Sequence, residues 1–427
     1  MNEHKLLARL LEEFHDNIKS LHDLVPRTAI FPNVKNKINV AIGMRRVGKT
    51  YFVFQKIKQL LDIGVELTQI LYINFEDDRL FPLNASTLAG LLDDFYSLYP
   101  DNHEKPCYFF LDEIQNIDNW ASVIRRFFDS KPVTIFLTGS SAKLLSKEIA
   151  TSLRGRSLST EIWPYDFNEY QVAINQVIDT RLFGAKTRDK LMKIFYQYLD
   201  TGGFPEVISY DSSIRDQTLQ DYVTIVTFRD IIERHSISNT AVIKYMISTM
   251  LANVATLFSI NKFYNDLKSQ GYKIGKDSLY DYAHYLEDAY LLFSVPLYAT
   301  SIRKVQSNPK KIYAIDTGLV RAMIFDMSKD FSHLFENLIY LELRRRGLEI
   351  YYYLTSNRYE VDFLVQTRKG EKELIQVTWD MTDDATRKRE ERALEAAILE
   401  LGIPGQIITM ESYLHHGLKL NSDRNKI

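Results

Sequence analysis

The stretch Ile38–Thr50 reads INVAIGMRRVGKT. Its first half is an apolar run rich in β-branched residues, which predicts a buried strand, and its second half follows the pattern G-x-x-x-x-G-K-T. In this pattern a strand ends in a tight loop, and the backbone N–H groups of that loop surround a phosphate at the N-terminus of the next helix. The sequence therefore predicts a site for a nucleoside triphosphate.

Each position of this loop has an expected role. Glycine at positions 43 and 48 lets the backbone approach the phosphate closely, Lys49 supplies positive charge to the β- and γ-phosphates, and Thr50 supplies a hydroxyl for Mg²⁺. The expected nucleotide-binding residues are Gly43, Met44, Arg45, Arg46, Val47, Gly48, Lys49, Thr50 and Tyr51. A ligand-free turn is the alternative, but the helical pattern at 51–61 favours phosphate binding.

Hydrolysis needs two further groups, a carboxylate that holds Mg²⁺ and a group that orients the attacking water. The apolar run at 108–111 ends in Asp112 and Glu113. Because ligands of parallel sheets bind at the carboxyl ends of strands, we expect Asp112 to hold Mg²⁺ and Glu113 to act as general base. With Lys49, Glu113 forms the expected catalytic pair. No Asn-Lys-x-Asp signature for guanine occurs, which favours ATP over GTP.

Further polar residues follow the next expected strand, at 133–138. Thr138 and Ser140 are candidates for sensing the γ-phosphate, and a helix cap is the alternative for the serine. Arg154 and Arg156 are candidates for contacting the γ-phosphate, either within the chain or from a neighbouring subunit. Solvated surface arginines are the alternative interpretation.

The composition of the chain limits the remaining classes. At 427 residues the chain is long enough for two to four domains, and 45% hydrophobic with 25% charged residues is ordinary globular composition. The net charge of −2 gives no overall basic field for nucleic acid. The single cysteine excludes an internal disulfide, and no apolar run is long enough to span a bilayer. We therefore expect a cytoplasmic protein with no membrane partner.

Periodicity outlines how the chain is organised. Near the N-terminus, apolar residues recur at spacings of four and three and predict a helix packed on the nucleotide-binding core, with an oligomer contact as the alternative. These residues are Leu7, Leu11, Phe14, Ile18 and Leu21. Strand-like runs then alternate with helical segments, which predicts a parallel sheet covered on both faces. Residues 167–237 are mainly helical. The region 238–304 shows a helix, a glycine-bearing turn, a second helix and two strands, the outline of a winged helix-turn-helix.

Motifs along nearly the whole chain are similar to those of one family. They are GMRRVGKT (43–50), NFED (74–77), LDEIQ (111–115), TGSSA (138–142), LRGR (153–156), GGFPE (202–206), KKIY (310–313), DTGL (316–319), FEN (335–337) and EVDF (360–363). The chain thereby resembles bacterial and archaeal AAA-type ATPases fused to a C-terminal domain of unknown function. The resemblance implies an α/β fold: an ASCE-type P-loop core with a parallel sheet, a helical lid, a winged helix and a restriction-endonuclease-like α/β domain.

Five segments are expected on this basis. An N-terminal helical segment occupies 1–36, the P-loop ATPase core 37–165, and the helical lid 166–237. The winged helix-turn-helix occupies 238–305, and the endonuclease-like domain 306–427.

The resemblance also identifies a second, altered site. Endonuclease-like domains hold Mg²⁺ with a helix acid, a strand Asp and an acid-x-Lys pair on the next strand. Glu336 and Asp362 match the first two, whereas Gln376 and Thr378 stand where the acid and the lysine belong. Neither substitute has the required charge, so we expect a degenerate site without nuclease activity. A lysine from elsewhere, such as Lys372 or Lys388, is the alternative that would restore it.

The sequence as a whole predicts a Mg²⁺-dependent ATPase that acts as a conformational switch on C-terminal modules. Two alternatives stay open: a regulatory module that binds ATP with little hydrolysis, and an ATP-regulated, metal-dependent nuclease. DNA and protein are both open as partners of the winged helix. Its basic residues, Lys268, Lys273 and Lys276, lie close to Asp277 and Asp281, which phosphates would repel. Oligomerisation is open as well.

Overall fold

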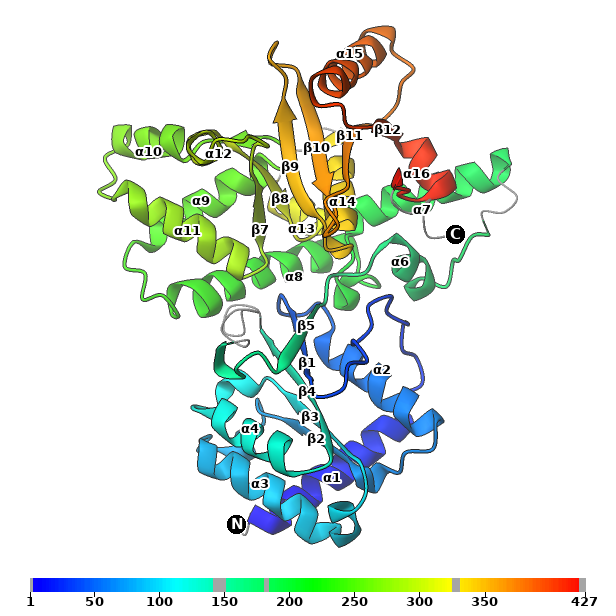
Figure 1. The fold of residues 1–427 in the computed structure, drawn as a ribbon, viewed down its shortest axis with the longest axis vertical. Coiled ribbons are helices and arrows are strands. Elements are labelled where there is room, and N and C mark those ends of the chain that lie inside the picture. Colours follow the sequence, from blue (N-terminus) through cyan, green and yellow to red (C-terminus); the bar gives the residue numbers. More distant parts are fainter. Residues whose placement is uncertain (1–2, 141–150, 180–183, 325–330, 422–427) are drawn as a thin grey trace. The chain divides into compact units, whose positions relative to one another are not determined.

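The structure is a computed structural model that describes residues 3–140, 151–179, 184–324 and 331–421 (Figure 1). The chain forms two compact units, Met1–Trp163 and Pro164–Ile427. Within the described ranges, no helix combines the length and apolar character that a membrane crossing requires.

The first unit is built around a five-stranded sheet in which all neighbouring strands run parallel. The strand order is β2-β3-β4-β1-β5. The strands are β1 (Ile38–Gly43), β2 (Ile70–Asn74), β3 (Cys107–Asp112), β4 (Val133–Ser140) and β5 (Ser157–Glu161). In the register, Gly43 lies opposite Ser140 and Asn74 lies opposite Asp112. The carboxyl ends of β1, β2, β3 and β4 therefore lie along one edge of the sheet. The predicted parallel α/β sheet is confirmed.

Helices cover both faces of this sheet. They are α1 (Glu3–Ser20), α2 (Lys49–Asp62), α3 (Ala85–Leu98) and α4 (Trp120–Ser130), with short 3-10 turns η1 (Leu67–Gln69), η2 (Asp78–Leu80), η3 (Pro100–His103) and η4 (Ile114–Asn116). Phe14 and Ile18 of α1 join Val53 of α2 in one buried cluster with side chains of β2, β3 and β4. On the other face, the ring of Phe95 in α3 packs against Phe109 in β3, 5.4 Å between centroids. Each such buried side chain contributes about 1.5–3 kcal/mol. The predicted apolar stripe of the first helix thus packs on the sheet.

The second unit begins with helices. These are α6 (Phe167–Ala173), α7 (Ala185–Thr201) and α8 (Ser212–Ile225), with the 3-10 turn η5 (Pro205–Val207) between the last two and the π-helical segment η6 (Val226–Ile232) after them. The backbone N–H of Gly203 donates to the Asp316 carboxylate (2.7 Å), and a Cβ on Gly203 would lie 2.3 Å from the Tyr165 carbonyl oxygen. A Cβ on Gly318 would lie 2.1 Å from the Thr201 carbonyl oxygen. Close backbone packing therefore explains the glycines of the GGFPE and DTGL motifs.

A small antiparallel sheet with the order β6-β8-β7 follows. Its elements along the chain are α9 (Thr240–Ala252), β6 (Leu257–Phe258), α10 (Ile260–Ser269), α11 (Lys276–Asp288), β7 (Leu292–Val295), α12 (Ile302–Ser307), β8 (Lys310–Ala314) and α13 (Thr317–Met323). The two helices α10 and α11 followed by a strand pair have the order from which the winged helix-turn-helix was predicted. That assignment stays a prediction.

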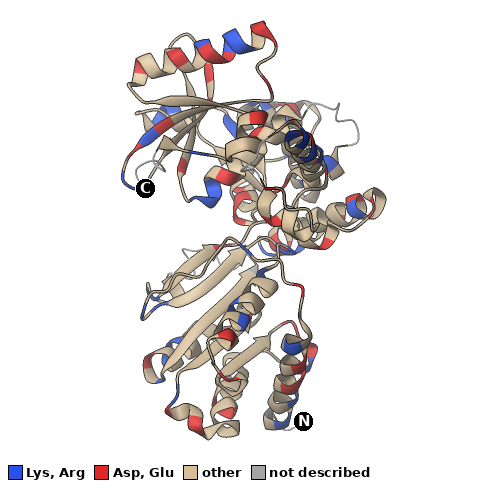
Figure 2. Cartoon of the chain, turned by 90° about the vertical axis from the view of Figure 1, so that its right-hand side faces the viewer, with Lys and Arg blue, Asp and Glu red and all other residues tan. Residues whose placement is uncertain are grey.

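A four-stranded sheet with the order β12-β11-β10-β9 completes the second unit. Its elements are α14 (Ser332–Arg345), β9 (Glu349–Leu354), β10 (Glu360–Gln366), β11 (Lys372–Thr378), α15 (Asp384–Leu401), β12 (Gly405–Thr409) and α16 (Met410–His416). Strands β9, β10 and β11 pair antiparallel, whereas β11 and β12 are parallel. The helix α15 buries Leu394 and Ala397 against Val361, Leu364 and Leu374. Basic and acidic residues are interspersed along its exposed surface (Figure 2).

Candidate nucleotide site

The predicted phosphate loop connects β1 to α2 at the carboxyl edge of the parallel sheet. Gly43 has φ 154°, and a Cβ there would lie 2.2 Å from the Ile162 carbonyl oxygen. Gly48 has φ 94° and directly precedes α2, which begins at Lys49. A side chain would be strained at both glycines, so the residue type is required by the backbone. The free N–H groups at the start of α2 open toward the loop, an arrangement that suits an anion.

Lys49 is buried and lies across this loop. Its ammonium donates to the carbonyl oxygens of Gly43 and Met44, both at 3.1 Å, and lies 3.8 Å from a carboxylate oxygen of Glu113. The positive charge is thus held at the loop by neutral carbonyl oxygens and one acid. Phosphate oxygens are stronger acceptors than carbonyls, so the ammonium is positioned to exchange these partners for a triphosphate.

Asp112 is at the centre of the site. The strands of this sheet contain very few charged residues (Figure 2), and Asp112 at the end of β3 is one of them. Its carboxylate accepts hydrogen bonds from the hydroxyls of Thr50 (2.8 Å) and Tyr72 (3.0 Å), and also from that of Thr138. Burial raises the pKa of Asp112, and the neighbouring charge of Glu113 adds to the increase. All three partners are neutral, and among the described residues no cation is paired with this buried carboxylate.

This donor set fits Mg²⁺. The ion prefers oxygen ligands and is usually bound by one or two protein groups, with phosphates and water completing the shell. The Thr50 hydroxyl and the Asp112 carboxylate are such a pair, and they already lie within hydrogen-bond distance. In the described part of the chain no group of three or more His, Cys, Asp or Glu is arranged to hold a metal.

Glu113 has an unusual backbone. Its φ of 55° lies in the left-handed region, which few non-glycine residues adopt and which is frequent at functional sites. Its N–H donates to the Thr138 hydroxyl (3.1 Å), and its carboxylate accepts from the side-chain amide of Gln115. Because the same Thr138 hydroxyl donates to Asp112, this residue joins the two acids.

The tip of β2 adds a third acid. Glu76 lies 3.6 Å from the guanidinium of Arg45, and burial raises its pKa, with Glu113 as the next cause. Asp77 does not take part, since it pairs with Arg79 (2.7 Å). The Asn74 side-chain oxygen accepts from the Glu76 backbone and thereby shapes the turn after the strand.

The remaining loop residues differ in burial and backbone conformation. Met44 and Val47 are fully buried and shape the loop from within. Tyr51 is 57% exposed and packs edge-on to Phe54. Arg46 has φ 67°, a left-handed conformation inside the loop.

Two arginine candidates lie at the wrong edge of the sheet for contact within the chain. The Arg156 carbonyl accepts from the N–H of Ile38, the first residue of β1, whereas the phosphate loop begins at the last residue of that strand, Gly43. At about 3.3 Å per residue the two ends of β1 are roughly 16 Å apart. Arg156 also pairs with Asp129 (3.2 Å), and Arg154 is exposed beside it. This position disfavours a contact between either arginine and the γ-phosphate of its own chain, and the role of both arginines stays a prediction. A contact from a neighbouring subunit stays a prediction.

The second sensor candidate, Ser140, ends β4 beside Gly43, but its side chain lies outside the described part of the structure.

Sequence reasoning missed two residues of the site. Arg27 donates to the Val47 carbonyl oxygen (3.0 Å) and to that of Trp163, and so braces the loop from outside. It belongs to no motif. Tyr72 could have been found, because it precedes the strand end Asn74 by two residues and therefore shares its face.

Comparison with known proteins places these observations in a family. Residues 35–171 match an AAA domain, and residues 192–330 and 331–411 match two domains of unknown function (DUF8612 and DUF4143). The uncharacterized protein MJ1544 of Methanocaldococcus jannaschii is 38% identical over 391 residues, which cover 90% of this chain and 84% of that protein. The chain belongs to the family of MJ1544.

An uncharacterized protein of Haemophilus influenzae is also similar to this chain. The two are 29% identical over 349 residues, which cover 81% of this chain and 84% of that protein. Among solved structures, the Walker-type ATPase PABY2304 of Pyrococcus abyssi is 14% identical, with 72% of this chain and 99% of that chain covered and a TM-score of 0.44. The AAA match and the parallel sheet with its phosphate loop make the first unit an AAA-type P-loop ATPase domain, which supports ATP binding.

The structure also brings together the acids of the altered nuclease motif. Glu336 and Asp362 both accept hydrogen bonds from the Lys311 ammonium, at 2.8 and 2.9 Å, and Lys311 was not among the predicted residues. Burial, followed by the charge of Asp362, raises the pKa of Glu336 to about 7. Gln376 accepts from the backbone of Asp362 and donates to Glu390 (2.6 Å).

The other residues considered for that site point elsewhere. The Thr378 hydroxyl donates to the Asp380 carbonyl oxygen (3.1 Å). Lys372 donates to the Tyr298 hydroxyl (2.7 Å), and Lys388 is exposed on α15. These contacts do not support the alternative in which Lys372 or Lys388 restores the nuclease site, and that alternative stays a prediction.

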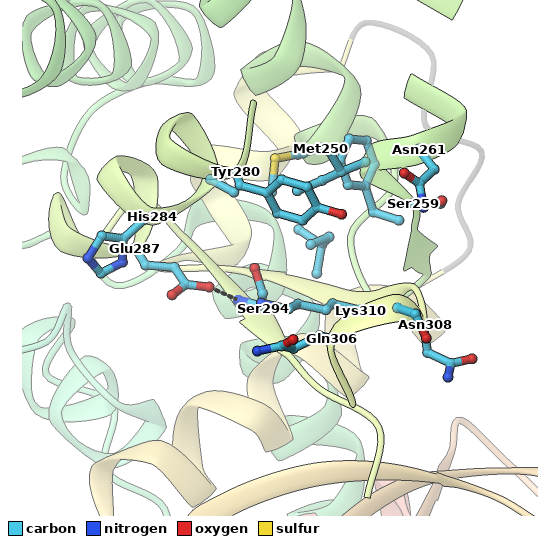
Figure 3. Close-up of a pocket in the computed structure, with 15 residues that line it drawn as sticks. Met250, Ser259, Asn261, Tyr280, His284, Glu287, Ser294, Gln306, Asn308 and Lys310 are labelled. Carbon is cyan, nitrogen blue, oxygen red and sulfur yellow. Dashed lines mark hydrogen bonds between the residues drawn. The ribbon is translucent and has the colours of Figure 1, made fainter. Parts of the chain in front are cut away.

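A cavity of about 120 Å³ lies beside α11 (Figure 3). Tyr280, His284 and Glu287 line it from the helix, and Ser294 and Lys310 line it from β7 and β8. Glu287 accepts from the Ser294 N–H (3.0 Å), as the dashed line shows. Sites for nucleotides and drug-sized ligands usually measure about 300–1,000 Å³, so this cavity is too small for such a ligand.

Proposed function

We propose that the first unit hydrolyses ATP with the help of Mg²⁺ and that the cycle acts as a conformational switch on the C-terminal modules. One observation carries the proposal: Asp112 gathers the hydroxyls of Thr50 and Thr138 beside the phosphate loop, and Thr138 also holds the backbone of Glu113. A metal-binding acid and a water-activating acid are thus positioned by one shared side chain.

Each residue has a role in the proposed reaction. The α2 N-terminus and Lys49 bind the β- and γ-phosphates, where they neutralise the charge that develops on the leaving group. Thr50 and Asp112 hold Mg²⁺, which supplies additional positive charge to the phosphate oxygens when it is bound. Glu113 accepts a proton from the attacking water. The Gln115 amide orients the Glu113 carboxylate, and Thr138 fixes its backbone.

The burial and the hydrogen-bond partners of Asp112 support the proposed binding of Mg²⁺. Its carboxylate is almost completely buried, and every contact described above is a neutral hydroxyl. Burying an unneutralised charge is costly, and a divalent cation in contact removes that cost. We therefore expect Mg²⁺ and nucleotide to bind with strong mutual dependence.

The second unit is proposed to contain the winged helix and to bind a partner. The exposed face of α11 carries Lys276, Asp277, Asp281 and His284, so basic and acidic groups alternate on it. In addition, the segment after β7 is tied to the edge strand β9, where the Tyr298 N–H donates to the Tyr352 carbonyl (2.8 Å). Acids on the helix face and a tethered connection both disfavour a fit into DNA grooves. A protein partner is the better-supported of the two classes, and a titration with duplex DNA tests the other.

The decisive experiment is an ATPase assay on the full chain with three variants. Lys49→Ala should abolish nucleotide binding, and Glu113→Gln should abolish phosphate release yet retain bound ATP. Lys58→Ala, on the same helix α2, is the matched control and should behave as wild type. No phosphate release by the wild type, with or without duplex DNA, contradicts the proposal.

The same variants separate the alternative functions. If the chain only binds ATP as a regulatory module, Glu113→Gln will be indistinguishable from wild type in nucleotide occupancy and in slow turnover. An ATP-regulated nuclease would cleave DNA with Mg²⁺ or Mn²⁺ and lose this activity in Asp362→Ala. The ammonium of Lys311 against Asp362 speaks against that function.

A further inference from the structure

Tyr72 connects the proposed metal-binding acid to the packing of the sheet. It lies in the middle of β2, and its hydroxyl donates to Oδ2 of Asp112 at the end of β3 (3.0 Å). The same oxygen accepts from the Thr50 hydroxyl (2.8 Å), whereas Thr138 donates to Oδ1. In the register of the two strands, Tyr72 lies opposite Phe110, two residues before Asp112. The long tyrosine side chain therefore reaches the carboxylate diagonally across the strand pair.

Two helices hold the aromatic ring of Tyr72 in place. The ring centroid lies 5.2 Å from that of Phe14 in α1 and 5.1 Å from that of Phe54 in α2. Both phenylalanines belong to the buried cluster on this face of the sheet, and contacts between aromatic rings prefer defined geometries. Because the phenolic oxygen is rigidly attached to its ring, the packing of the ring determines where the hydroxyl lies.

Ion pairs hold the helix α1 beside this ring. Arg79, just after the tip of β2, lies 2.8 Å from Glu13 of α1 and 2.7 Å from Asp77. Glu13 directly precedes Phe14, so the ion pair and the ring contact act on the same turn of the helix. Partly exposed ion pairs contribute little to overall stability. Their effect here is local, since they keep α1 against the strand that carries Tyr72.

The three hydroxyls that donate to Asp112 differ in their other contacts. Thr50 is itself a proposed ligand of Mg²⁺, and Thr138 also accepts from the backbone of Glu113. Tyr72 has neither of these roles. An ionised carboxylate offers about four lone-pair sites, so the bond from Tyr72 leaves acceptor capacity for a metal ion. The Tyr72 hydroxyl therefore fixes the orientation of the carboxylate without using the lone pairs that a metal requires.

We propose that Tyr72 is a positioning residue for Mg²⁺ binding: its hydroxyl holds the Asp112 carboxylate in the orientation that accepts the ion, and its contact with Phe14 makes this orientation depend on the N-terminal helix. The inference rests on the proposed function, in which Asp112 holds Mg²⁺. Tyr72 acts through Asp112 and takes no part in the chemical step. Hydrogen-bond partners of metal ligands typically contribute about 10–100-fold to metal affinity.

The test compares two tyrosines on neighbouring strands in the full chain. Tyr72→Phe removes the hydroxyl and keeps the ring. Tyr108→Phe is the matched control, because Tyr108 on β3 packs against the same buried cluster. For each protein, binding of a fluorescent, non-hydrolysable ATP analogue is titrated with Mg²⁺. In a parallel titration with the analogue present, binding of Mn²⁺ is followed by the loss of the electron paramagnetic resonance signal of the free ion.

The expected effect is specific to the metal. The metal concentration for half-maximal binding should rise about tenfold or more in Tyr72→Phe and stay at the wild-type value in Tyr108→Phe. In EDTA, the affinity for the analogue should be the same in all three proteins, because Tyr72 acts through the metal-binding acid.

An unchanged metal requirement in folded Tyr72→Phe overturns the proposal. An equal rise in Tyr108→Phe also overturns it, because the cause would then be the general packing of the cluster. If Tyr72→Phe does not fold, Phe14→Leu decides: it keeps the hydroxyl but loosens the ring, so it should raise the metal requirement by a smaller factor, and an unchanged requirement contradicts the proposal.

Wild type tests the proposed function separately. If wild type binds the analogue without any need for metal, both the proposed function and this inference fail. If wild type and Tyr72→Phe need the same metal concentration, this inference alone fails.

Discussion

Asp112→Asn removes the central charge of the nucleotide site while it keeps the shape of the side chain. Burial raises the pKa of Asp112 in the folded protein above the ordinary value of 3.8. A raised pKa in the folded state means that the protonated group favours folding, and this contribution is lost as the pH rises through the folded pKa. Ionisation of this carboxylate therefore lowers the stability of the nucleotide-free protein.

Two opposing effects set the size of the change. Three hydrogen bonds from hydroxyls would lose a charged acceptor, at about 1 kcal/mol each. Removal of a buried, unpaired charge raises the free energy of unfolding by several kcal/mol. The hydroxyls can also turn to accept from the new amide, because they are both donors and acceptors. The free energy of unfolding without nucleotide should therefore change by no more than about 2 kcal/mol.

The effect of Asp112→Asn on stability should become large when nucleotide is bound. At a ligand concentration of about 100 times the Kd, wild type gains about 2.7 kcal/mol, which corresponds to a rise of roughly 5–10 °C in melting temperature. Asp112→Asn cannot hold Mg²⁺ and should show almost none of this rise. Thermal unfolding of both proteins, with and without Mg²⁺ and a non-hydrolysable ATP analogue, measures the difference. Asp118→Asn, an exposed acid after the same strand, is the control. The reasoning fails if the nucleotide-free variant melts more than about 10 °C below wild type, or if its nucleotide-induced rise is intact.

Three further predictions follow from named contacts. Arg27→Ala removes a hydrogen bond to the Val47 carbonyl and should weaken ATP binding about tenfold in a fluorescent-nucleotide titration; unchanged affinity would show that the brace is dispensable. Gly203→Ala places a Cβ 2.3 Å from the Tyr165 carbonyl oxygen, so we expect loss of soluble, folded protein by circular dichroism, whereas Gly184→Ala meets open space and should fold normally. Burial raises the pKa of Asp316 from 3.8 to about 6, so its stabilising contribution is present below about pH 4 and lost as the pH rises to 6. Denaturation at pH 4 and pH 7 should therefore show wild type losing about 3 kcal/mol relative to Asp316→Asn over this range, and a constant difference would contradict the shifted pKa.

The parts of the site that were predicted are those encoded locally. The phosphate loop, the acids at the end of β3 and the apolar strands each depend on neighbouring residues, because strand alternation and helix periodicity act over short distances. The parallel sheet followed from the alternation of these segments, and the structure confirms it. Thr138 was singled out because its strand ends beside the one that carries Asp112, and the two side chains do meet.

The parts that were not predicted depend on contacts distant in sequence. Arg27 contacts the loop from 20 residues away, and Lys311 contacts Asp362 across 51 residues. Neither contact leaves a periodic pattern, because the partners lie on separate segments that only tertiary packing brings together. The position of Arg154 and Arg156 was also not predicted. No strand was recognised from the sequence at 157–161, and the parallel register of β5 against β1 places both arginines at the amino ends of these strands.

The two buried acid centres of this protein differ in one physical respect. Asp112 is held by neutral hydroxyls, so its charge calls for a cation from outside, whereas Asp362 is held by the Lys311 ammonium and already has one. A buried carboxylate with neutral partners should bind a cation strongly when a second anion, such as a triphosphate, arrives with it, because both charges are then neutralised together. A buried carboxylate with a fixed ammonium gains nothing from a further cation and repels it. Metal dependence should therefore be confined to the nucleotide site: with a non-hydrolysable ATP analogue present, Mn²⁺ binding should be lost in Asp112→Asn and retained in Asp362→Asn.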